Sequence, residues 1–293
     1  MNLMRTAISI LLAMILCPAG CKPEEELQQA APESPSWNES FPQAQAKPED
    51  HFIYVVQLKM ITVEVPVGAA SGSDDLWSHL DEEPVHLYQA SLGRNGFRVG
   101  RASAQSWPEI RRTLQRLTGA EASESSMWTL PNTSLTIVLK SRQGEQTIFT
   151  SMQDRTLSGM DYPAGDNLLT VQCNFNADEP DHVVMIAQPQ IRTLRSAPQI
   201  VQDSNSLMIV HRPKVFNFPQ LTFQLSVPNN DLVIVGPGDE ARRPGSVANH
   251  FLMTEKQGLP FETVLIMIPS ITRAASRPTT LETPRSADAI PST

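Results

Sequence analysis

The sequence predicts a β-dominated α+β fold: mostly antiparallel sheet, with one or two short helices packed on it. A long run of β-forming residues, Phe52–Val65, follows a leader that is rich in Pro, Glu and Gln. Beyond this run, short apolar stretches alternate with turns that contain Gly, Pro or Asn, which is typical of antiparallel strands. One segment, 107–117, has instead the periodicity of an amphipathic helix.

The stretch Phe52–Val65 is the longest uninterrupted β-type run in the chain. At about 3.3 Å per residue it extends roughly 45 Å, which is long for a strand. Alternate residues point to opposite faces, so the even-numbered residues from Phe52 to Met60 form one apolar face. The opposite face is apolar except at Gln57 and Lys59. We therefore expect the spine of a sheet, with one end of that face meeting solvent or a partner.

Helical signals occur in two places. Residues 76–90 predict a short helix that Pro84 breaks, because a proline inside a helix removes a backbone hydrogen bond. The second segment, 107–117, has Ile110, Leu114 and Leu117 as its apolar residues. Their spacing of four and three places them on one face and predicts a helix packed against the sheet.

The remaining strands are expected between turns. Residues 133–140 and 147–151 flank a hairpin-like connection, and residues 167–174 and 182–191 flank a second one. Further strands are predicted at 207–211, 221–227, 231–235 and 263–268. Asn95-Gly96 is a turn signal ahead of another short strand.

Residues 1–21 have the organisation of an export signal. Arg5 supplies a positive charge, Thr6–Leu16 is apolar, and small residues precede Cys21. The eleven residues of the apolar region would span about 16 Å as a helix, short of the ~30 Å core of a bilayer. This segment is therefore not expected to be a transmembrane anchor.

The end of this signal, Pro18-Ala19-Gly20-Cys21, resembles the lipobox of bacterial lipoproteins, although an aliphatic residue is usual where Pro18 stands. The resemblance implies signal cleavage between Gly20 and Cys21, and lipidation of the Cys21 thiol. The alternative is an ordinary secretory peptide cut nearby, with Cys21 left as a free thiol. Lys22 follows the cysteine instead of the aspartate that retains lipoproteins at the inner membrane. The expected location is therefore the cell envelope, with the outer membrane favoured over the inner one.

We expect four segments: a signal peptide at 1–21, a flexible acidic tether at 22–50, a single β-rich domain at 51–273 and a disordered tail at 274–293. The tether is rich in Pro, Glu and Gln and has too few large apolar residues to offset the entropy of ordering it. Two lysines and seven acidic residues give it −5 of the chain's net charge of −8. The acidity therefore says little about the domain, and no basic surface indicates a nucleic-acid partner.

No catalytic, cofactor-binding or metal-binding residue is predicted, and no cofactor. The only cluster of metal-ligand types is His79, Asp81, Glu82, Glu83 and His86. Pro84 interrupts it and no zinc-ligand spacing is present, so a solvated polar segment is favoured.

Two further features have simple structural interpretations. Gly236-Pro237-Gly238 opens a G-x-G-x-x-A match after an apolar strand, but Pro244-Gly245 stops any following helix and favours a turn. Cys173 lies on the apolar side of a predicted strand, so we expect a buried, unreactive thiol.

The order of elements resembles the C-terminal homology domain of bacterial secretins. Five stretches are similar to that domain: the long strand 56–65 with its acidic residue before the final valine, the helix 107–117, the strand 183–191 with its proline turn, the strand 232–236 running into glycine, and the closing strand 263–271. The resemblance implies a β-rich envelope module that assembles with itself or with a secretion apparatus. It does not imply a complete export pore.

We therefore expect a lipid-anchored envelope protein whose domain is a non-catalytic binding or assembly module, with the membrane, a second copy or another envelope protein as its partner. The alternative is an envelope hydrolase or carbohydrate-active enzyme whose site is assembled by the fold. An enzyme stays open because sequence patterns do not reveal such a site.

The lipid anchor predicts incorporation of labelled palmitate into the wild-type protein and its loss in Cys21→Ser, because the acyl chain is attached through that thiol. Metabolic labelling followed by immunoprecipitation measures this. Cys173→Ser is the matched control and should keep the label. Equal labelling of wild type and Cys21→Ser would exclude the anchor.

Overall fold

The computed structural model describes residues 52–82, 85, 89–118, 122–152, 154–176, 179–203 and 206–275. All of them lie in one compact unit, Asp50–Thr293. Strands make up 63% of these residues and helices 18%, and the sheets are antiparallel, which confirms the predicted fold class. No helix among the described residues is long and apolar enough to cross a membrane.

The first sheet, sheet A, is built around the first and last strands of the unit. Its strands, in spatial order, are β2 (Phe97–Ala102), β11 (Leu232–Pro237), β13 (Leu259–Ala275), β1 (Phe52–Pro66) and β3 (Ala122–Thr129), with β12 (Met253–Lys256) also on β13. β1 pairs with β13 without interruption from Phe52↔Ala275 to Pro66↔Phe261. The predicted spine strand is therefore confirmed, and β13 is its longest partner.

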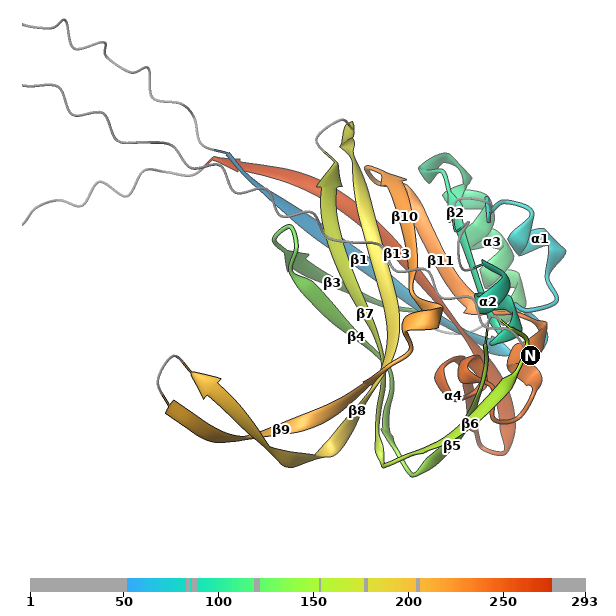
Figure 1. The fold of residues 1–293 in the computed structure, drawn as a ribbon. Coiled ribbons are helices and arrows are strands. Elements are labelled where there is room, and N and C mark those ends of the chain that lie inside the picture. Colours follow the sequence, from blue (N-terminus) through green and yellow to red (C-terminus); the bar gives the residue numbers. More distant parts are fainter. Residues whose placement is uncertain are drawn as a thin grey trace, which may run out of the picture. The chain divides into compact units, whose positions relative to one another are not determined.

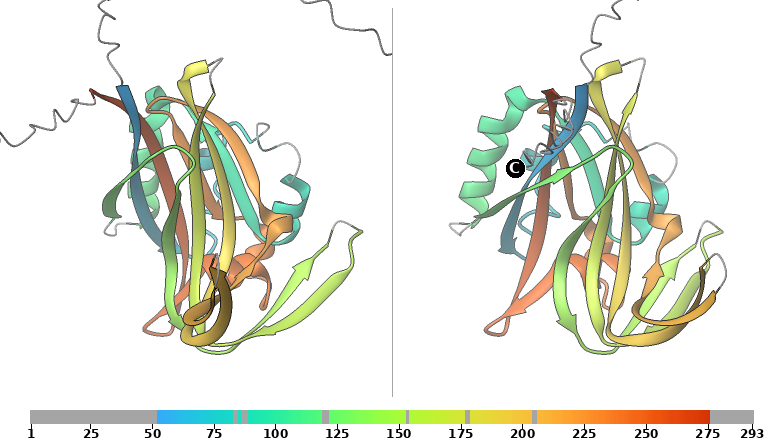
Figure 2. Two further views of the ribbon diagram at one scale, coloured as in Figure 1. Left: turned by 60° about the vertical axis from the view of Figure 1, so that its left-hand side comes forward. Right: turned by 90° about the vertical axis from the view of Figure 1, so that its left-hand side faces the viewer.

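The second sheet, sheet B, faces sheet A (Figures 1 and 2). Its strands, in spatial order, are β10 (Phe223–Pro228), β8 (Glu179–Asp203), β7 (Gly165–Asn176) and β4 (Ser134–Gln143), with β9 (Ser206–Asn217) also on β8. The predicted hairpin of 167–174 and 182–191 is confirmed as β7 and β8.

The other predicted hairpin is wrong. β4 pairs with β7, while the next strand, β5 (Gln146–Ser151), pairs with β6 (Leu157–Tyr162). The β4–β7 ladder shifts register twice, around Lys140, and then gives way to the β5–β6 pair. The sequence between β4 and β5 is therefore a bend in one long hairpin and not a turn between partners.

Each face of sheet A contacts a different core. Even-numbered residues of β1, such as Val56 and Leu58, pack in the cluster shared with sheet B. Odd-numbered residues from Ile61 onward pack in a second cluster with α3 (Trp107–Thr118) and α1 (Asp74–Trp77), which cover the outer face of sheet A (Figure 2). Nearer the start of β1, the side chain of Lys59 is half exposed and pairs with Glu124. The prediction that Gln57 and Lys59 mark an end of this face that meets solvent or a partner is consistent with this exposure.

The helix predicted at 107–117 is confirmed, with Ile110 and Leu114 buried against the sheet. The helix predicted at 76–90 is wrong: α1 ends at Trp77 and α2 begins at Gln89 (Gln89–Arg94), while residues 83, 84 and 86–88 lie outside the described part of the chain. Trp77 is buried and its indole N–H donates to the Ala70 carbonyl at 2.9 Å. This bond fixes the indole on the preceding loop.

The remaining helices are short. Among the described residues they include α4 (Val247–Leu252) and the 3-10 turns η2 (Ala104–Ser106), η3 (Pro219–Leu221) and η4 (Asp239–Arg242). Ser246 caps α4 by accepting a hydrogen bond from the backbone N–H of Asn249. Phe251 and Leu252 of α4 are fully buried in the core between the sheets, so this helix closes the end of the sandwich.

One fully buried carboxylate holds the loop after β1 in place. Oε1 of Glu262, on β13, accepts from the Gly68 N–H and the Ser71 hydroxyl, both at 2.7 Å. Oε2 accepts from the N–H groups of Ala70 and Ser71 at 3.0 and 2.9 Å. Four donors satisfy the buried charge, and the same donors fix the path of the chain toward α1.

Replacing Glu262 by glutamine should lower the free energy of unfolding by about 2–4 kcal/mol, because an amide NH2 would face two of these donors and leave them unsatisfied. Urea denaturation followed by circular dichroism measures the change. Glu255→Gln, at an exposed position of β12, is the matched control and should stay close to wild type. Equal stability of the two variants would contradict this assignment.

Candidate functional site

A cavity of about 500 Å³ opens between α2, the start of β2 and η4. Its lining residues are Ser71, Glu82, Val85, Leu92, Gly93, Phe97, Arg98, Val99, Gly238, Asp239 and Glu240. The aliphatic and aromatic members of this set are buried and form an apolar floor, while the charged ones form the rim. A concave surface with an apolar floor and a few polar groups is typical of a binding site.

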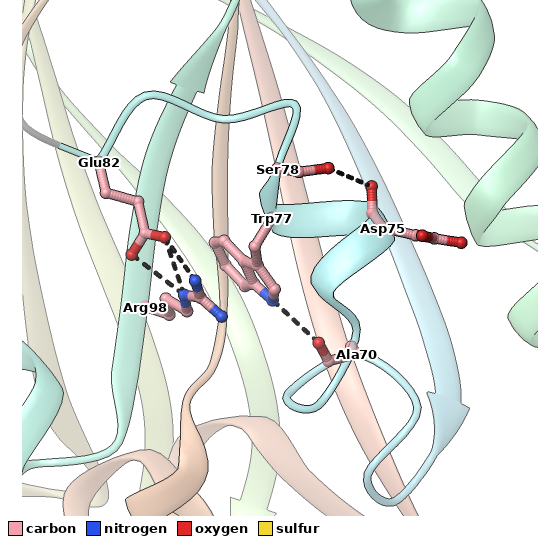
Figure 3. Close-up of polar contacts among 6 residues, drawn as sticks. All are labelled: Ala70, Asp75, Trp77, Ser78, Glu82 and Arg98. Atoms are coloured by element: carbon pink, nitrogen blue, oxygen red, sulfur yellow. Dashed lines mark hydrogen bonds and ion pairs between the residues drawn. The ribbon is translucent and has the colours of Figure 1, made fainter.

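The rim is organised by Arg98, whose guanidinium is fixed from two directions (Figure 3). Its Nε and Nη2 donate to the Glu82 carboxylate at 2.7 to 3.0 Å. Its Cζ lies 4.4 Å from the centroid of the Trp77 ring, in a cation–π contact. Since the indole is itself bonded to Ala70, Trp77 and Glu82 together give Arg98 one fixed position.

The other carboxylates of the rim come from η4. Glu240 pairs with Arg243 at 3.3 Å. Asp239 is exposed, and no hydrogen bond or ion pair of its side chain occurs within the described residues. Three carboxylates and one guanidinium therefore line the cavity, and Asp239 is the acceptor that is still open.

This arrangement is better suited to ion pairing than to acid–base chemistry. Both oxygens of Glu82 accept from Arg98, and the Ser71 hydroxyl donates to the buried Glu262 while accepting from Arg242. A nucleophile needs a base that is free to take its proton. The hydroxyl in this cavity is already bonded to groups that hold the loop in place.

The predicted Asn95-Gly96 turn joins this cavity to the β5–β6 hairpin. The Asn95 side chain donates to the Ser151 carbonyl at 2.9 Å and accepts from the Ser151 N–H at 2.8 Å, as a strand partner would. Gly96 has a φ of +85°, and a Cβ there would lie 2.6 Å from the backbone nitrogen of Ala241. Its carbonyl accepts from the N–H of Gly238, which continues the pairing of β2 with β11 by one residue. Gly236 and Pro237 are therefore the end of β11, and the turn that the sequence favoured begins only after Gly238, as η4.

Two hairpin ribbons leave sheet B at the end opposite to the start of β1, and they point in different directions (Figure 1). We define the β8–β9 ribbon as residues 194–203 and 206–215, where β8 has run past its pairing with β7. We define the β5–β6 ribbon as residues 145–162.

Both ribbons expose apolar side chains. Of the sixteen large hydrophobic side chains that are exposed among the described residues, ten lie on them. Those of the β8–β9 ribbon are Leu194, Ile200, Leu207, Met208, Ile209 and Val215. Those of the β5–β6 ribbon are Phe149, Met152, Leu157 and Met160. A concentration of exposed apolar groups of this kind marks an interaction surface.

Buried polar contacts fix the root of the β5–β6 ribbon. The side-chain amides of Gln146 and Asn167 donate to each other at 3.0 and 2.8 Å, and Asn167 also donates to the His250 carbonyl at 2.8 Å. Lys140 Nζ donates to the Asn249 carbonyl at 3.3 Å, and burial lowers the pKa of this lysine to about 8. The bend in the long hairpin is therefore tied to α4.

The other residues singled out in the sequence are separated by the fold. Nδ1 of His79 lies 3.7 Å from Glu109, and Glu82 is bound to Arg98. Glu83 and His86 lie outside the described residues, and no group of three or more metal-ligand side chains forms within the part that is described. Gly20 and Cys21, the predicted cleavage and lipidation residues, also lie outside the described residues.

The sequence did not reveal the cavity or the ribbons. The cavity combines residues between 71 and 240 that become neighbours only in the folded chain. The β8–β9 ribbon does have a local signal: Gln199–Gln202 and Leu207–Val210 carry apolar residues at consecutive positions around a polar turn. Consecutive apolar positions in a strand place apolar groups on both of its faces. A strand that buries only one face usually alternates apolar and polar residues instead.

No protein-family model matches the sequence, and no curated protein is significantly similar to it. Among solved structures, the secretin domain β-barrel of InvG from the Salmonella SPI-1 injectisome has a TM-score of 0.17 and 10% identity, over 78% of this chain and 63% of that one. For PilQ, the type IV competence pilus secretin of V. cholerae, the TM-score is 0.20 with 12% identity, over 75% and 60%.

For GspD, the type II secretin of enteropathogenic Escherichia coli, the TM-score is 0.19 with 11% identity, over 76% and 67%. The chain spans less than two thirds of the InvG and PilQ chains. These solved structures are secretins, the family that the sequence resembles. Values this low do not make the chain a member of that family.

Cys173 should resist alkylation in the native protein, because its side chain is fully buried and burial raises the pKa of the thiol to about 12. Iodoacetamide treatment at mildly alkaline pH, followed by mass spectrometry of the Cys173 peptide, measures this site separately from the other cysteines. The same peptide should be fully modified in guanidinium chloride. Modification in the native state would show that the strand opens.

Proposed function

We propose that this protein is a lipid-anchored envelope protein whose β-rich domain, residues 51–273, joins copies of itself without catalysing a reaction. The pair of apolar ribbons is the observation that carries the proposal. A two-stranded ribbon is marginally stable in water, and ten exposed apolar side chains add to the cost of leaving these two uncovered. Association with another chain removes that cost.

The ribbons have free strand edges as well as apolar faces. Within the described residues, β9 pairs only with β8, and β8 pairs only with β9 beyond Thr193. β6 pairs only with β5. Unpaired N–H and C=O groups along such an edge accept an additional strand, which provides backbone hydrogen bonds together with side-chain contacts.

The charges of the two ribbons favour a head-to-tail contact. The β8–β9 ribbon carries Arg195, Arg212 and Lys214 against Asp203, while the β5–β6 ribbon carries Glu145, Asp154 and Asp161 against Arg155. One ribbon is therefore basic and the other acidic, so the first on one copy is complementary to the second on the next. A contact between different surfaces of identical chains closes into a ring or continues as a filament.

The predicted anchor and tether fit this role. A lipid on Cys21 and a flexible segment at 22–50 would let the domain move roughly 30 Å from the membrane surface, enough for neighbouring anchored copies to meet. The proposal includes an envelope location, with the outer membrane favoured, and a distant relation to secretins that rests on the five sequence motifs.

The full-length protein in detergent should associate as its concentration rises, and Ile209→Asp should weaken that association about tenfold or more, because the contact would bury an unpaired carboxylate. Ile209 is 69% exposed in the single copy, so the substitution should leave the fold intact. Sedimentation velocity over a concentration series measures the association constant.

Leu259→Asp is the matched control for that experiment. Leu259 is 61% exposed but lies at the start of β13, away from both ribbons. It should associate like wild type. A wild-type protein that stays monomeric at all concentrations would refute the proposed function. Equal weakening by both substitutions would show that the β8–β9 ribbon is not the surface through which the copies associate.

A further inference from the structure

We propose that the cavity between α2, β2 and η4 is a socket for an arginine side chain, Arg212, from the β8–β9 ribbon of a second copy. The inference rests on the proposed function, since it names a contact that self-association would use. It also goes beyond that function, because self-association through the ribbon edges does not require the cavity to be filled.

The chemistry of the lining favours a cation with an aliphatic stem. Leu92, Phe97 and Val99 are each at most 3% exposed and form a floor along which methylene groups can lie. Above this floor, Asp239 is a carboxylate with no side-chain partner within the described residues. A guanidinium that reached Asp239 would form a charge-assisted pair at the exposed rim of the cavity, with its stem on the apolar floor.

The fixed positions of Arg98 and Glu82 keep the socket open to a second cation. Glu82 neutralises the charge of Arg98 through bidentate hydrogen bonds, and the cation–π contact with Trp77 fixes the guanidinium at the wall of the cavity. An entering guanidinium therefore meets a paired arginine and an unpaired carboxylate. An anionic ligand would meet that carboxylate instead and be repelled by it, so the lining selects positive charge.

The acidic ribbon, on which a neighbour is proposed to lie, is hydrogen-bonded to the segments that follow α2 and η4 at the cavity. Asn95 bonds to Ser151 at the end of β5, and Arg243 Nη2 donates to the Arg94 carbonyl at 3.3 Å across the wall of the cavity. Phe149 of β5 donates its N–H to the Gly245 carbonyl at 2.8 Å, just after η4. A basic ribbon that followed β5–β6 would therefore run beside the segments that carry Arg98 and Asp239.

Among the cations of the basic ribbon and its base, Arg212 is the one best placed to leave its own chain. Arg192 pairs with Asp166 at 3.0 Å, and Lys214 Nζ lies 4.6 Å above the Phe216 ring. Arg195 lies at the start of the ribbon, within the register shift between Arg192 and Ser196, and is therefore closer to sheet B than Arg212 is. Arg212 is exposed and makes no ion pair with any described residue.

A charge exchange tests the socket in the full-length protein. By sedimentation velocity at constant salt, Asp239→Arg and Arg212→Asp should each weaken association about tenfold, the effect of losing one charge-assisted contact. The double variant, in which the two charges have changed places, should recover to near the wild-type association constant. Circular dichroism confirms that each variant is folded.

The matched control places the same new positive charge at a position outside the proposed contact. Glu255→Arg, on the exposed part of β12, should associate like wild type, and combining it with Arg212→Asp should give no recovery. A monomeric wild type would refute the proposed function itself. If wild type associates and both single variants associate equally well, the socket is wrong while self-association stands. Weakening without recovery in the double variant would overturn the pairing of Asp239 with Arg212.

Discussion

The ladder between β1 and β13 is the constraint on which the other parts of the structure depend. Because Phe52 pairs with Ala275 and the register holds to Pro66, the first and last strands of the unit form the centre of sheet A. Both chain ends of the described unit therefore lie at one end of the sheet, and the two ribbons leave from the other (Figure 1). A tether joined at Phe52 would leave the ribbons free to contact neighbours.

Buried polar side chains hold the segments that the ladders do not reach. Glu262 satisfies four donors from the loop after β1, Asn95 replaces a strand partner for Ser151, and Asn167 joins the bend of the long hairpin to α4. Each of these groups would be costly if it were unpaired in the core. Each therefore selects one conformation of an irregular segment, and the cavity lies where two of those segments meet.

The sequence was sufficient where periodicity and burial agree. The alternation in Phe52–Val65 predicted β1, and the spacing of Ile110 and Leu114 predicted α3, because each element buries one face. It was insufficient where partners are distant in the chain. Nothing local shows that β4 pairs with β7 and not with β5, and the pairing of Glu82 with Arg98 depends on the course of the chain between them.

The ribbons give the strongest physical reason to expect a partner. Sheets A and B already share a continuous core in which the large apolar residues between them are buried. The exposed apolar groups of the ribbons therefore contribute little to folding this unit, and keeping them in water costs roughly 25 cal/mol for each Å² that could be buried. If the ribbons contacted only lipid, their opposite charges would have no role in the contact. They do favour one relative orientation of two identical chains, because like ribbons repel and unlike ribbons attract.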